Sequence, residues 1–405
     1  QERTATGASE LIMGQSPQPS FEGDFQLDQL KLDSGATLRP AVLRYAIYGE
    51  LNSDRTNAVL VCHALSGSAR VADWWAELFG ENAPFNPERD CIICVNILGS
   101  CYGSTGPTST DPDTGQQYGP DFPLVSIRDT VRAQAALVQS LGIDRLRCVI
   151  GGSIGGMQAL EWAIQFPDRV ARCICIGVTR CSAMALALNH LQRRAIQLDP
   201  AFSGGHYEPG QGPTGGISVA RGLAMCTYKS GDLFTERYGR KQNRNGENPF
   251  ATGDGRFDVA GYLDYQGQIF NRRFDANSYI SITRTMDTFD FARGFASDQD
   301  ALRRIQACVL LVGISSDWLF PPADVRALAA QIESAGVDCT YAEIVSDHGH
   351  DAFLAEPEKL LPLVSAALDA GPPAVSTAVA GRVAKPRKPA FGSFAESNPL
   401  ASPAD

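Results

Sequence analysis

Continuous apolar runs and amphipathic stretches alternate along the first half of the chain. The apolar runs are typical of strands buried inside a parallel sheet, and they cover 43–51, 57–67, 90–99, 145–152 and 170–178. Residues 125–144 have helical spacing and end on a glycine stop, and a second helix starts at "SIGGMQAL" and ends before Pro167. This alternation predicts an α/β fold with helices on both faces of the sheet.

The pattern changes in the middle of the chain. Between about 180 and 297, helical segments are joined by loops rich in Gly and Pro, and no clear strand occurs. The alternation then returns, with strands at 306–314 and 339–345 and helices at 322–335 and 355–369. We therefore expect a helical insertion in a sheet domain. The predicted division is a core of 23–180 and 298–370, with a helical cap at 181–297.

Both ends of the chain lack periodicity. Residues 1–22 are polar and predict a flexible lead-in, whereas 371–405 are rich in Pro, Ala and Ser and predict a disordered tail. The first residues have no basic segment followed by an apolar core, so a secretory signal is not expected, and the missing initiator Met suggests a trimmed start. No apolar run reaches the ~18 residues that would cross a bilayer, so we expect no membrane association.

Composition and net charge limit the kinds of partner that the chain is expected to bind. The 405 residues are 44% hydrophobic and 20% charged, which is typical of a soluble globular protein. The net charge of −10 argues against binding to nucleic acid. The 11 cysteines are odd in number and lie mostly in apolar runs, and Cys91 and Cys94 fall in a strand-like run. We therefore expect reduced thiols, no metal site and a cytoplasmic location.

The candidate chemistry begins with "CVIGGSIGGMQAL". Gly151, Ser153 and Gly155 match G-x-S-x-G between a predicted strand and a predicted helix, which is the turn that exposes a serine nucleophile. A tight turn without function is the commoner source of so short a match. A phosphate-binding loop is disfavoured because neither glycine-rich phosphate motif is present.

A serine nucleophile needs a base and an acid, which in this architecture follow it in the order acid, then histidine. The late histidines are His348 and His350 in "SDHGHDAFL", and spacing alone leaves both open. Asp317 follows a late strand and is the preferred acid, because Asp347 lies within the histidine loop itself. The oxyanion hole is expected from the backbone N–H groups of Ile154 and Leu65. His63 is expected to be structural.

Several motifs together resemble one family. "CHALSGSARVADWW", "NILGSCYGSTGP", "YGPDFP", "ARGLAMCTYKS", "DANSYISITRTMD" and "GHDAFL" occur in order over roughly 24–369, around the serine motif. They are similar to the homoserine O-acetyltransferase family of acyl-CoA-dependent acyltransferases. The resemblance implies an α/β-hydrolase fold, a mostly parallel sheet with helices on both faces and a helical cap (lid) insertion. It also implies a ping-pong mechanism through an acyl-serine.

The resemblance also assigns roles to individual residues. It implies Ser153 as nucleophile, Asp317 as acid and His350, rather than His348, as base. The oxyanion hole falls on the backbone of Leu65 and Ile154. For the amino-acid acceptor it implies three binding residues, and the first two lie seven positions apart on one helix face. These are Arg221, Tyr228 and Asp351.

The chain departs from the family pattern at two positions. Ile154 stands where the family usually has Met, and a backbone donor survives that change. Lys229 in "TYKS" stands where Arg is usual, which could alter coenzyme contacts or the packing of the cap. The basic cluster "RYGRKQNR" (237–244) could meet the phosphates of coenzyme A, although an exposed helix end explains it equally well.

The resemblance implies transfer of acetyl from acetyl-CoA, as co-substrate, to L-homoserine, a step of methionine biosynthesis. No permanently bound cofactor or metal is expected, and the family implies a homodimer that forms through the cap helices. The alternatives within the family are a serine O-acetyltransferase and a homoserine or serine O-succinyltransferase. A capped serine esterase is a more distant alternative, because the same triad can hydrolyse esters.

Overall fold

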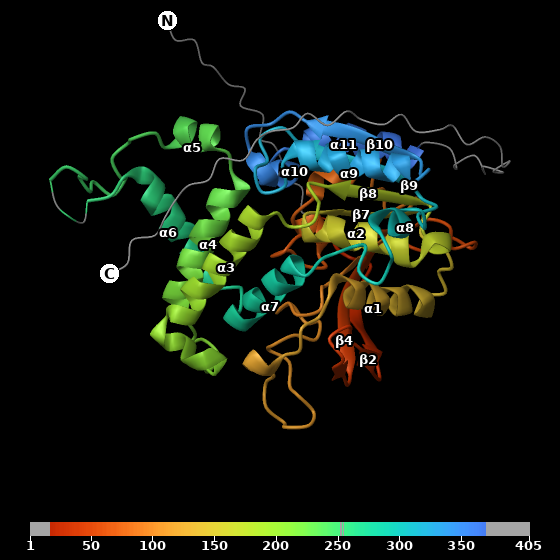
Figure 1. Ribbon diagram of the computed structural model, residues 1–405, viewed down its shortest axis with the longest axis horizontal. Coiled ribbons are helices and arrows are strands. Elements are labelled where there is room, and N and C mark those ends of the chain that lie inside the picture. The colour runs from red at the N-terminus through yellow and green to blue at the C-terminus, as the bar shows by residue number, and fades with distance from the viewer. Residues whose placement is uncertain (1–16, 252, 254, 370–405) are drawn as a thin grey trace, which may run out of the picture. The chain divides into compact units, whose positions relative to one another are not determined.

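Eight strands form the main sheet of the computed structural model, which describes residues 17–251, 253 and 255–369 (Figure 1). A separate two-stranded sheet pairs β2 with β3. The strands are β1 (Phe21–Leu27), β2 (Leu30–Lys31), β3 (Thr37–Leu38), β4 (Ala41–Tyr48), β5 (Ala58–Cys62), β6 (Cys91–Val95), β7 (Cys148–Gly152), β8 (Arg172–Ile176), β9 (Cys308–Ile314) and β10 (Cys339–Ile344).

The order of the main sheet is β1-β4-β6-β5-β7-β8-β9-β10. β4 pairs antiparallel with β1 and β6, and the remaining pairs from β6 to β10 are parallel. Side chains of β5 to β8 are buried on both faces, which explains their continuous apolar runs. The predicted α/β architecture, a mostly parallel sheet, is confirmed.

The first strand was not predicted, and the lead-in prediction was wrong at its end. β1 begins at Phe21, inside the segment 1–22 that the sequence indicated as flexible. β1 lies at the edge of the sheet, its side chains are exposed or half-buried, and its sequence has no apolar run. Pairing with β4 therefore defines this strand, rather than its own hydrophobic pattern.

Helices cover both faces of the sheet. The 3₁₀ turns are η1 (Val71–Asp73), η2 (Ala76–Leu78), η3 (Gly119–Asp121), η4 (Pro167–Arg169), η5 (Pro200–Gly205) and η6 (Gly349–Asp351). The α-helices are α1 (Ile127–Ser140), α2 (Ile154–Gln165), α3 (Ala183–Leu198), α4 (Thr214–Tyr228), α5 (Gly231–Arg237), α6 (Asp258–Asn271), α7 (Ala276–Asp287), α8 (Asp298–Leu302), α9 (Pro322–Ser334), α10 (Ala352–Ala355) and α11 (Pro357–Asp369).

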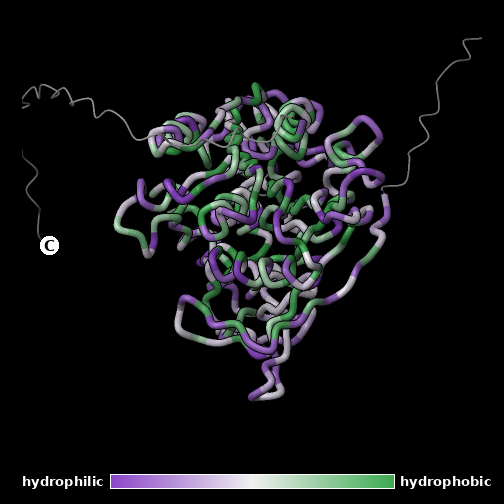
Figure 2. Tube along the Cα trace, turned by 90° about the vertical axis from the view of Figure 1, so that its right-hand side faces the viewer, coloured by the Kyte–Doolittle hydropathy of each residue, from purple (hydrophilic) through white to green (hydrophobic). Residues whose placement is uncertain are grey.

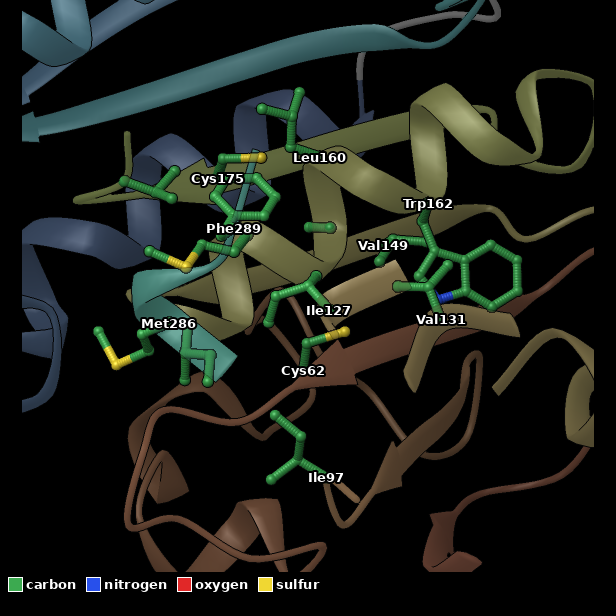
Figure 3. Packing of buried hydrophobic residues seen from close by; sticks show 14 of the residues in the cluster. Cys62, Ile97, Ile127, Val131, Val149, Leu160, Trp162, Cys175, Met286 and Phe289 are labelled. Carbon is green, nitrogen blue, oxygen red and sulfur yellow. The ribbon is translucent and has the colours of Figure 1, made fainter. Parts of the chain in front are cut away.

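Alternate side chains of each strand enter two separate hydrophobic clusters. Leu60 and Cys62 of β5 pack in the cluster that includes α1, α2 and α9, whereas Val59 and Val61 pack with η1, α10 and α11. Figure 3 shows the first cluster, where Trp162 of α2 lies beside the sheet. Figure 2 shows the hydrophobic segments concentrated in the interior and hydrophilic ones on many outer loops.

The helices α3 to α8 lie between β8 and β9 in the chain, and the described part of that segment contains no strand. In Figure 1 the green helices α3, α4 and α6 lie together beside the sheet. α4 packs between α3 and α6, and α3 also packs against α7. Met286 at the end of α7 and Phe289 after it enter the same cluster as the sheet (Figure 3). The inserted helices and the sheet therefore belong to one compact unit.

Two predictions fall on the remaining segments. The tail 371–405 and most of the lead-in lie outside the described residues. The predicted final helix near 355–369 is confirmed as α11, which begins at Pro357, two residues later than expected. Among the described residues, no helix is long and apolar enough to cross a membrane, and no group of His, Cys, Asp and Glu could hold a metal ion.

Candidate active site

Ser153 occupies a strained turn between β7 and α2. Its backbone has φ of 58° and ψ of −128°, a conformation that non-glycine residues rarely adopt. Such strain costs on the order of 1–3 kcal/mol and recurs at functional sites. The N–H of Ser153 donates to the carbonyl of Ile176 at 2.9 Å, so β8 holds the turn in place. The sequence predicted this sharp strand-to-helix turn, and its position in the chain is confirmed.

The glycines of the motif are required by close backbone approaches. A Cβ on Gly151 would lie 2.3 Å from the carbonyl carbon of Gly155. A Cβ on Gly155 would lie 2.1 Å from the carbonyl oxygen of Cys62, at the end of β5. Both distances are shorter than any real contact of a Cβ atom, so α2 can begin this close to the sheet only with glycine at both positions.

Asp317 and His350 form a buried pair. Nδ1 of His350 donates to Oδ2 of Asp317 at 2.7 Å, and the other carboxylate oxygen, Oδ1, accepts from the N–H groups of Leu319 and Phe320, each at 2.9 Å. The proton is therefore on Nδ1, and Nε2 carries a lone pair. Nε2 is buried and makes no hydrogen bond to any described residue.

The charge state of His350 follows from these contacts. Burial lowers the pKa of the imidazole, but the charge and hydrogen bond of Asp317 raise it by more, with a smaller contribution from Asp351. The net pKa of His350 therefore lies above its ordinary value. A neutral imidazole whose Nε2 is unprotonated, yet readily accepts a proton, is suited to general base catalysis.

The other late candidates lie elsewhere. His348 interacts with Nη2 of Arg237 through Nε2 at 3.0 Å and with Glu356 through Nδ1 at 3.3 Å, so its ring is not directed at Asp317. Asp347 is exposed. The structure thus pairs His350 and Asp317, and it leaves the neighbouring histidine and acid outside the pair.

A cavity of about 710 Å³ brings the other predicted residues together. Ser153 and His350 line it. Ile154 and Asp317 are buried and do not line it. The remaining predicted residues that line the cavity are Leu65, Arg221, Tyr228 and Asp351.

The segment after β5 supplies one side of the cavity. The N–H groups of Leu65 and Ile154 make no hydrogen bond to any described residue, and the first N–H groups of a helix have no partner within it. His63 donates from Nδ1 to the carbonyl of Ala64 at 2.7 Å and accepts from the N–H of Ile97 at 3.1 Å. Burial lowers the pKa of His63 to about 4. His63 is therefore neutral and holds this segment by its ring.

The inserted helices supply another part of the lining. Arg221 and Tyr228 lie on one face of α4, and the guanidinium carbon of Arg221 lies 5.7 Å from the ring centroid of Tyr228 and 4.8 Å from that of Phe270. Within the described residues, Arg221 has no ion pair, and its buried Nε has no hydrogen-bond partner. The cavity therefore presents an uncompensated cation.

Two features of the cavity were missed by sequence reasoning. Arg273 donates from Nη1 to the carbonyl of Ser66 at 2.9 Å and to the hydroxyl of Tyr102 at 2.8 Å, so it ties the inserted helices to the segment after β5. The only feature of the sequence that could have pointed to Arg273 is its position just before the motif "DANSYISITRTMD". Lys229 pairs with Asp351 at 2.9 Å, a contact that the unusual lysine in "TYKS" could have suggested.

The basic cluster 237–244 does not line this cavity. Arg237 contacts His348, and Arg244 forms an ion pair with Asp258. Arg240 lies over the ring of Phe257. These contacts account for the three arginines of the cluster without a ligand.

Known proteins have sequences similar to most of this chain. The profile of the α/β hydrolase fold matches residues 57–357. The chain is 43% identical to a homoserine O-acetyltransferase of Geotalea uraniireducens, over 84% of this chain and 94% of that protein. It is also 43% identical to a homoserine O-succinyltransferase of Alkalilimnicola ehrlichii, over 81% of this chain and 88% of that one.

Solved structures give the same picture. The homoserine O-acetyltransferase of Bacillus anthracis matches with a TM-score of 0.81 at 26% identity, over 86% of this chain and 97% of that chain. Esterase E22 matches with a TM-score of 0.79 at 25% identity, over 86% of this chain and 100% of that chain.

Proposed function

This chain belongs to the homoserine O-acetyltransferase family of the α/β hydrolase fold, and we propose that it transfers an acetyl group from acetyl-CoA to the side-chain hydroxyl of L-homoserine. One observation carries the proposal. A single cavity holds Ser153, His350 and Arg221, and among the described residues neither Nε2 of His350 nor Nε of Arg221 has a hydrogen-bond partner. The first two suit acyl transfer through serine, and the third suits an acceptor that carries a carboxylate.

In the first half-reaction, Oγ of Ser153 attacks the thioester carbonyl while Nε2 of His350 takes its proton. The negative charge that forms on the carbonyl oxygen is stabilised by the N–H groups of Leu65 and Ile154. The C–S bond then breaks, coenzyme A leaves as a thiol with the proton from His350, and acetyl-Ser153 remains. Asp317 stabilises the imidazolium that exists between the two proton transfers.

In the second half-reaction, His350 takes the proton of the homoserine hydroxyl, whose oxygen attacks the acetyl-serine carbonyl. The bond to Oγ then breaks, His350 returns the proton to Ser153, and O-acetylhomoserine leaves. We assign Arg221 to the acceptor carboxylate and Asp351 to its ammonium group, with Tyr228 beside them. Burial raises the pKa of Tyr228 to about 12, so its hydroxyl remains protonated as a donor.

A capped esterase is a second candidate, because esterase E22 has a similar structure. The two functions differ in what attacks the acyl-serine, which is water in an esterase. Arg221 has no ion pair among the described residues, and this favours transfer, since hydrolysis of a simple ester requires no cation for an acceptor. The inserted helices contribute Arg221, Tyr228 and Arg273 to the lining of the cavity, so the insertion forms part of the wall around the acyl-serine.

The test is to mix the enzyme with acetyl-CoA alone and follow the free thiol of coenzyme A. We expect a burst of one CoA per active site, slow turnover afterwards, and fast release once L-homoserine is added. Ser153→Ala should abolish the burst. Rapid steady release without acceptor would indicate an esterase, and the absence of a burst would exclude the acyl-serine.

The acyl donor and the acceptor are tested by a grid of acetyl-CoA and succinyl-CoA against L-homoserine and L-serine. Succinyl-CoA is included as a donor because the relative from Alkalilimnicola ehrlichii is named a homoserine O-succinyltransferase. We expect acetyl-CoA with L-homoserine to have the highest kcat/KM. A better rate with succinyl-CoA or L-serine would reassign the enzyme within its family.

We further propose a cytoplasmic homodimer whose product enters methionine biosynthesis, with residues 181–297 as the cap and with no permanently bound cofactor. The free thiols support a reducing compartment. For the dimer, the support is a row of exposed apolar side chains with seven-residue spacing on α3, namely Met184, Leu191 and Leu198. Leu191→Glu should shift the mass measured by light scattering to that of a monomer.

A further inference from the structure

An ion pair between Lys229 and Asp351 joins the inserted helices to the loop that carries the base. Nζ of Lys229 lies 2.9 Å from Oδ2 of Asp351. Lys229 follows α4 in the inserted helices, whereas Asp351 ends η6 and is the next residue after His350. Both side chains are largely buried, with 13% and 21% exposure. An ion pair that is shielded from water in this way has a better-defined geometry than one at the surface.

The backbone around Lys229 is fixed from both sides. Nε1 of Trp318 donates to the carbonyls of Cys226 and Lys229, each at 3.2 Å. Oγ of Ser230 donates to the carbonyl of Asp347, in the loop that carries the base. These hydrogen bonds hold the start of the lysine side chain against the loop of His350. The backbone from which the Lys229 side chain extends to Asp351 is therefore held in place.

The pair leaves half of the carboxylate free. Lys229 contacts Oδ2, whereas Oδ1 of Asp351 makes no hydrogen bond to any described residue, and Asp351 lines the cavity. A carboxylate offers about four acceptor positions, so it can accept from a second ammonium group. A free side chain at this position could rotate, and both oxygens would then be equally available to the loop and the cavity.

We propose that Lys229 is a positioning residue for acceptor recognition: by holding Oδ2 of Asp351, it directs Oδ1 to the ammonium group of the acceptor. This inference rests on the proposed function. It makes the preference for an α-amino acid depend on a side chain that does not itself touch the acceptor. The opposite role, in which Lys229 competes with the acceptor ammonium for Asp351, predicts tighter acceptor binding when the lysine is removed.

The experiment compares two acceptors that differ only by the ammonium group, L-homoserine and 4-hydroxybutyrate. Lys229→Met removes the charge and keeps much of the stem, and Lys229→Arg restores a cation. Lys31→Met is the matched control, since Lys31 is exposed on β2 and does not line the cavity. The CoA burst with acetyl-CoA counts the active sites that are folded in each preparation, so each rate is expressed per active site.

We expect Lys229→Met to raise the KM for L-homoserine by about ten-fold, the effect of one misplaced hydrogen bond to a charged group. Its kcat/KM for 4-hydroxybutyrate should stay within about two-fold of wild type, and Lys229→Arg should recover most of the loss. Asp351→Asn should abolish the preference for the amino acid. Adding Lys229→Met to that variant should then have no further effect on either acceptor.

Three outcomes overturn the inference. Equal losses for the two acceptors would show a purely structural role, and an unchanged KM would show no role. A lower KM for L-homoserine would show competition. A wild-type enzyme that gives no burst, or no faster release with L-homoserine, would instead overturn the proposed function itself.

Discussion

Replacing Asp317 with Asn tests whether His350 must carry its ring proton on Nδ1 in order to act as the base. Oδ1 of Asp317 accepts from the N–H groups of Leu319 and Phe320. In Asp317→Asn the amide oxygen must remain at this place, because the amide NH₂ group would otherwise face two donors. The NH₂ group must then face Nδ1 of His350, 2.7 Å away in the present pair.

The size of the effect follows from this geometry. An NH₂ group that faces Nδ1 requires Nδ1 to accept, so the ring proton moves to Nε2. Nε2 can then no longer take the proton of Ser153. A base locked in the wrong tautomer lowers kcat by on the order of 10⁴, which corresponds to ~5.5 kcal/mol of barrier. The fold should be retained, because the two backbone hydrogen bonds remain.

The pH dependence gives a second readout with a definite sign. In the wild type, burial lowers the pKa of His350, and Asp317 raises it by more, to above the ordinary 6.5. Because the base must be neutral, kcat/KM falls as the pH drops through this raised pKa. In Asp317→Asn the raising contribution is lost while burial remains. The acid limb of the residual activity should therefore move to lower pH.

The assay is CoA release with acetyl-CoA and L-homoserine between about pH 5 and 9, per folded enzyme. Asp347→Asn is the control, because Asp347 is exposed in the same loop as the base and should leave the rate unchanged. The reasoning is refuted if Asp317→Asn keeps a rate within about ten-fold of wild type, or if its acid limb moves to higher pH.

Three further changes probe other parts of the argument. Gly155→Ala would place a Cβ 2.1 Å from the carbonyl of Cys62, so the turn must shift and the burst should disappear; a normal burst would contradict the close approach. Arg221→Met should raise the KM for L-homoserine by about 100-fold without removing the burst, and an unchanged KM would exclude its carboxylate role. Ser126→Ala removes the cap of α1, which accepts from the N–H of Asp129 at 3.0 Å; it should lower the unfolding free energy by about 1–2 kcal/mol in urea titration and leave kcat unchanged.

The hydrophobic pattern was sufficient for the central sheet but not for its edge. β5 to β8 are buried on both faces, so each has an apolar run that is visible without its neighbours. β1 has no such run, because only one edge of the strand is paired and its side chains remain exposed or half-buried. Its existence depends on β4 and therefore could not be predicted from its own residues.

In the histidine loop, too, the sequence alone could not decide between two residues. His348 and His350 are two residues apart, and chain order allows either one to follow the acid. In the structure, η6 directs His350 to Asp317, while His348 faces Arg237 and Glu356. The resemblance to a family made the choice in advance, whereas the spacing of the residues could not.

The pairing of Lys229 with Asp351 also could not be predicted from the sequence. The sequence marked Lys229 as unusual and Asp351 as a binding residue, yet their contact joins segments more than a hundred positions apart. Whether a charge is paired or free depends on what packs against it. Arg221 illustrates the converse, since its lack of an acidic partner among the described residues is visible only when the surrounding side chains are in place.

By itself, the sequence determined the local features of this protein: the strand and helix periods, the glycines of the serine turn, and the order of serine, acid and histidine. The periods and the glycines depend on neighbours along the chain, and the order of the three residues is read directly from it. Only the tertiary structure decided which histidine meets the acid, which charges are paired and which residues share the cavity. Ser153, Asp317 and His350 come from the ends of separate strands, and parallel strands bring those ends to one edge of the sheet.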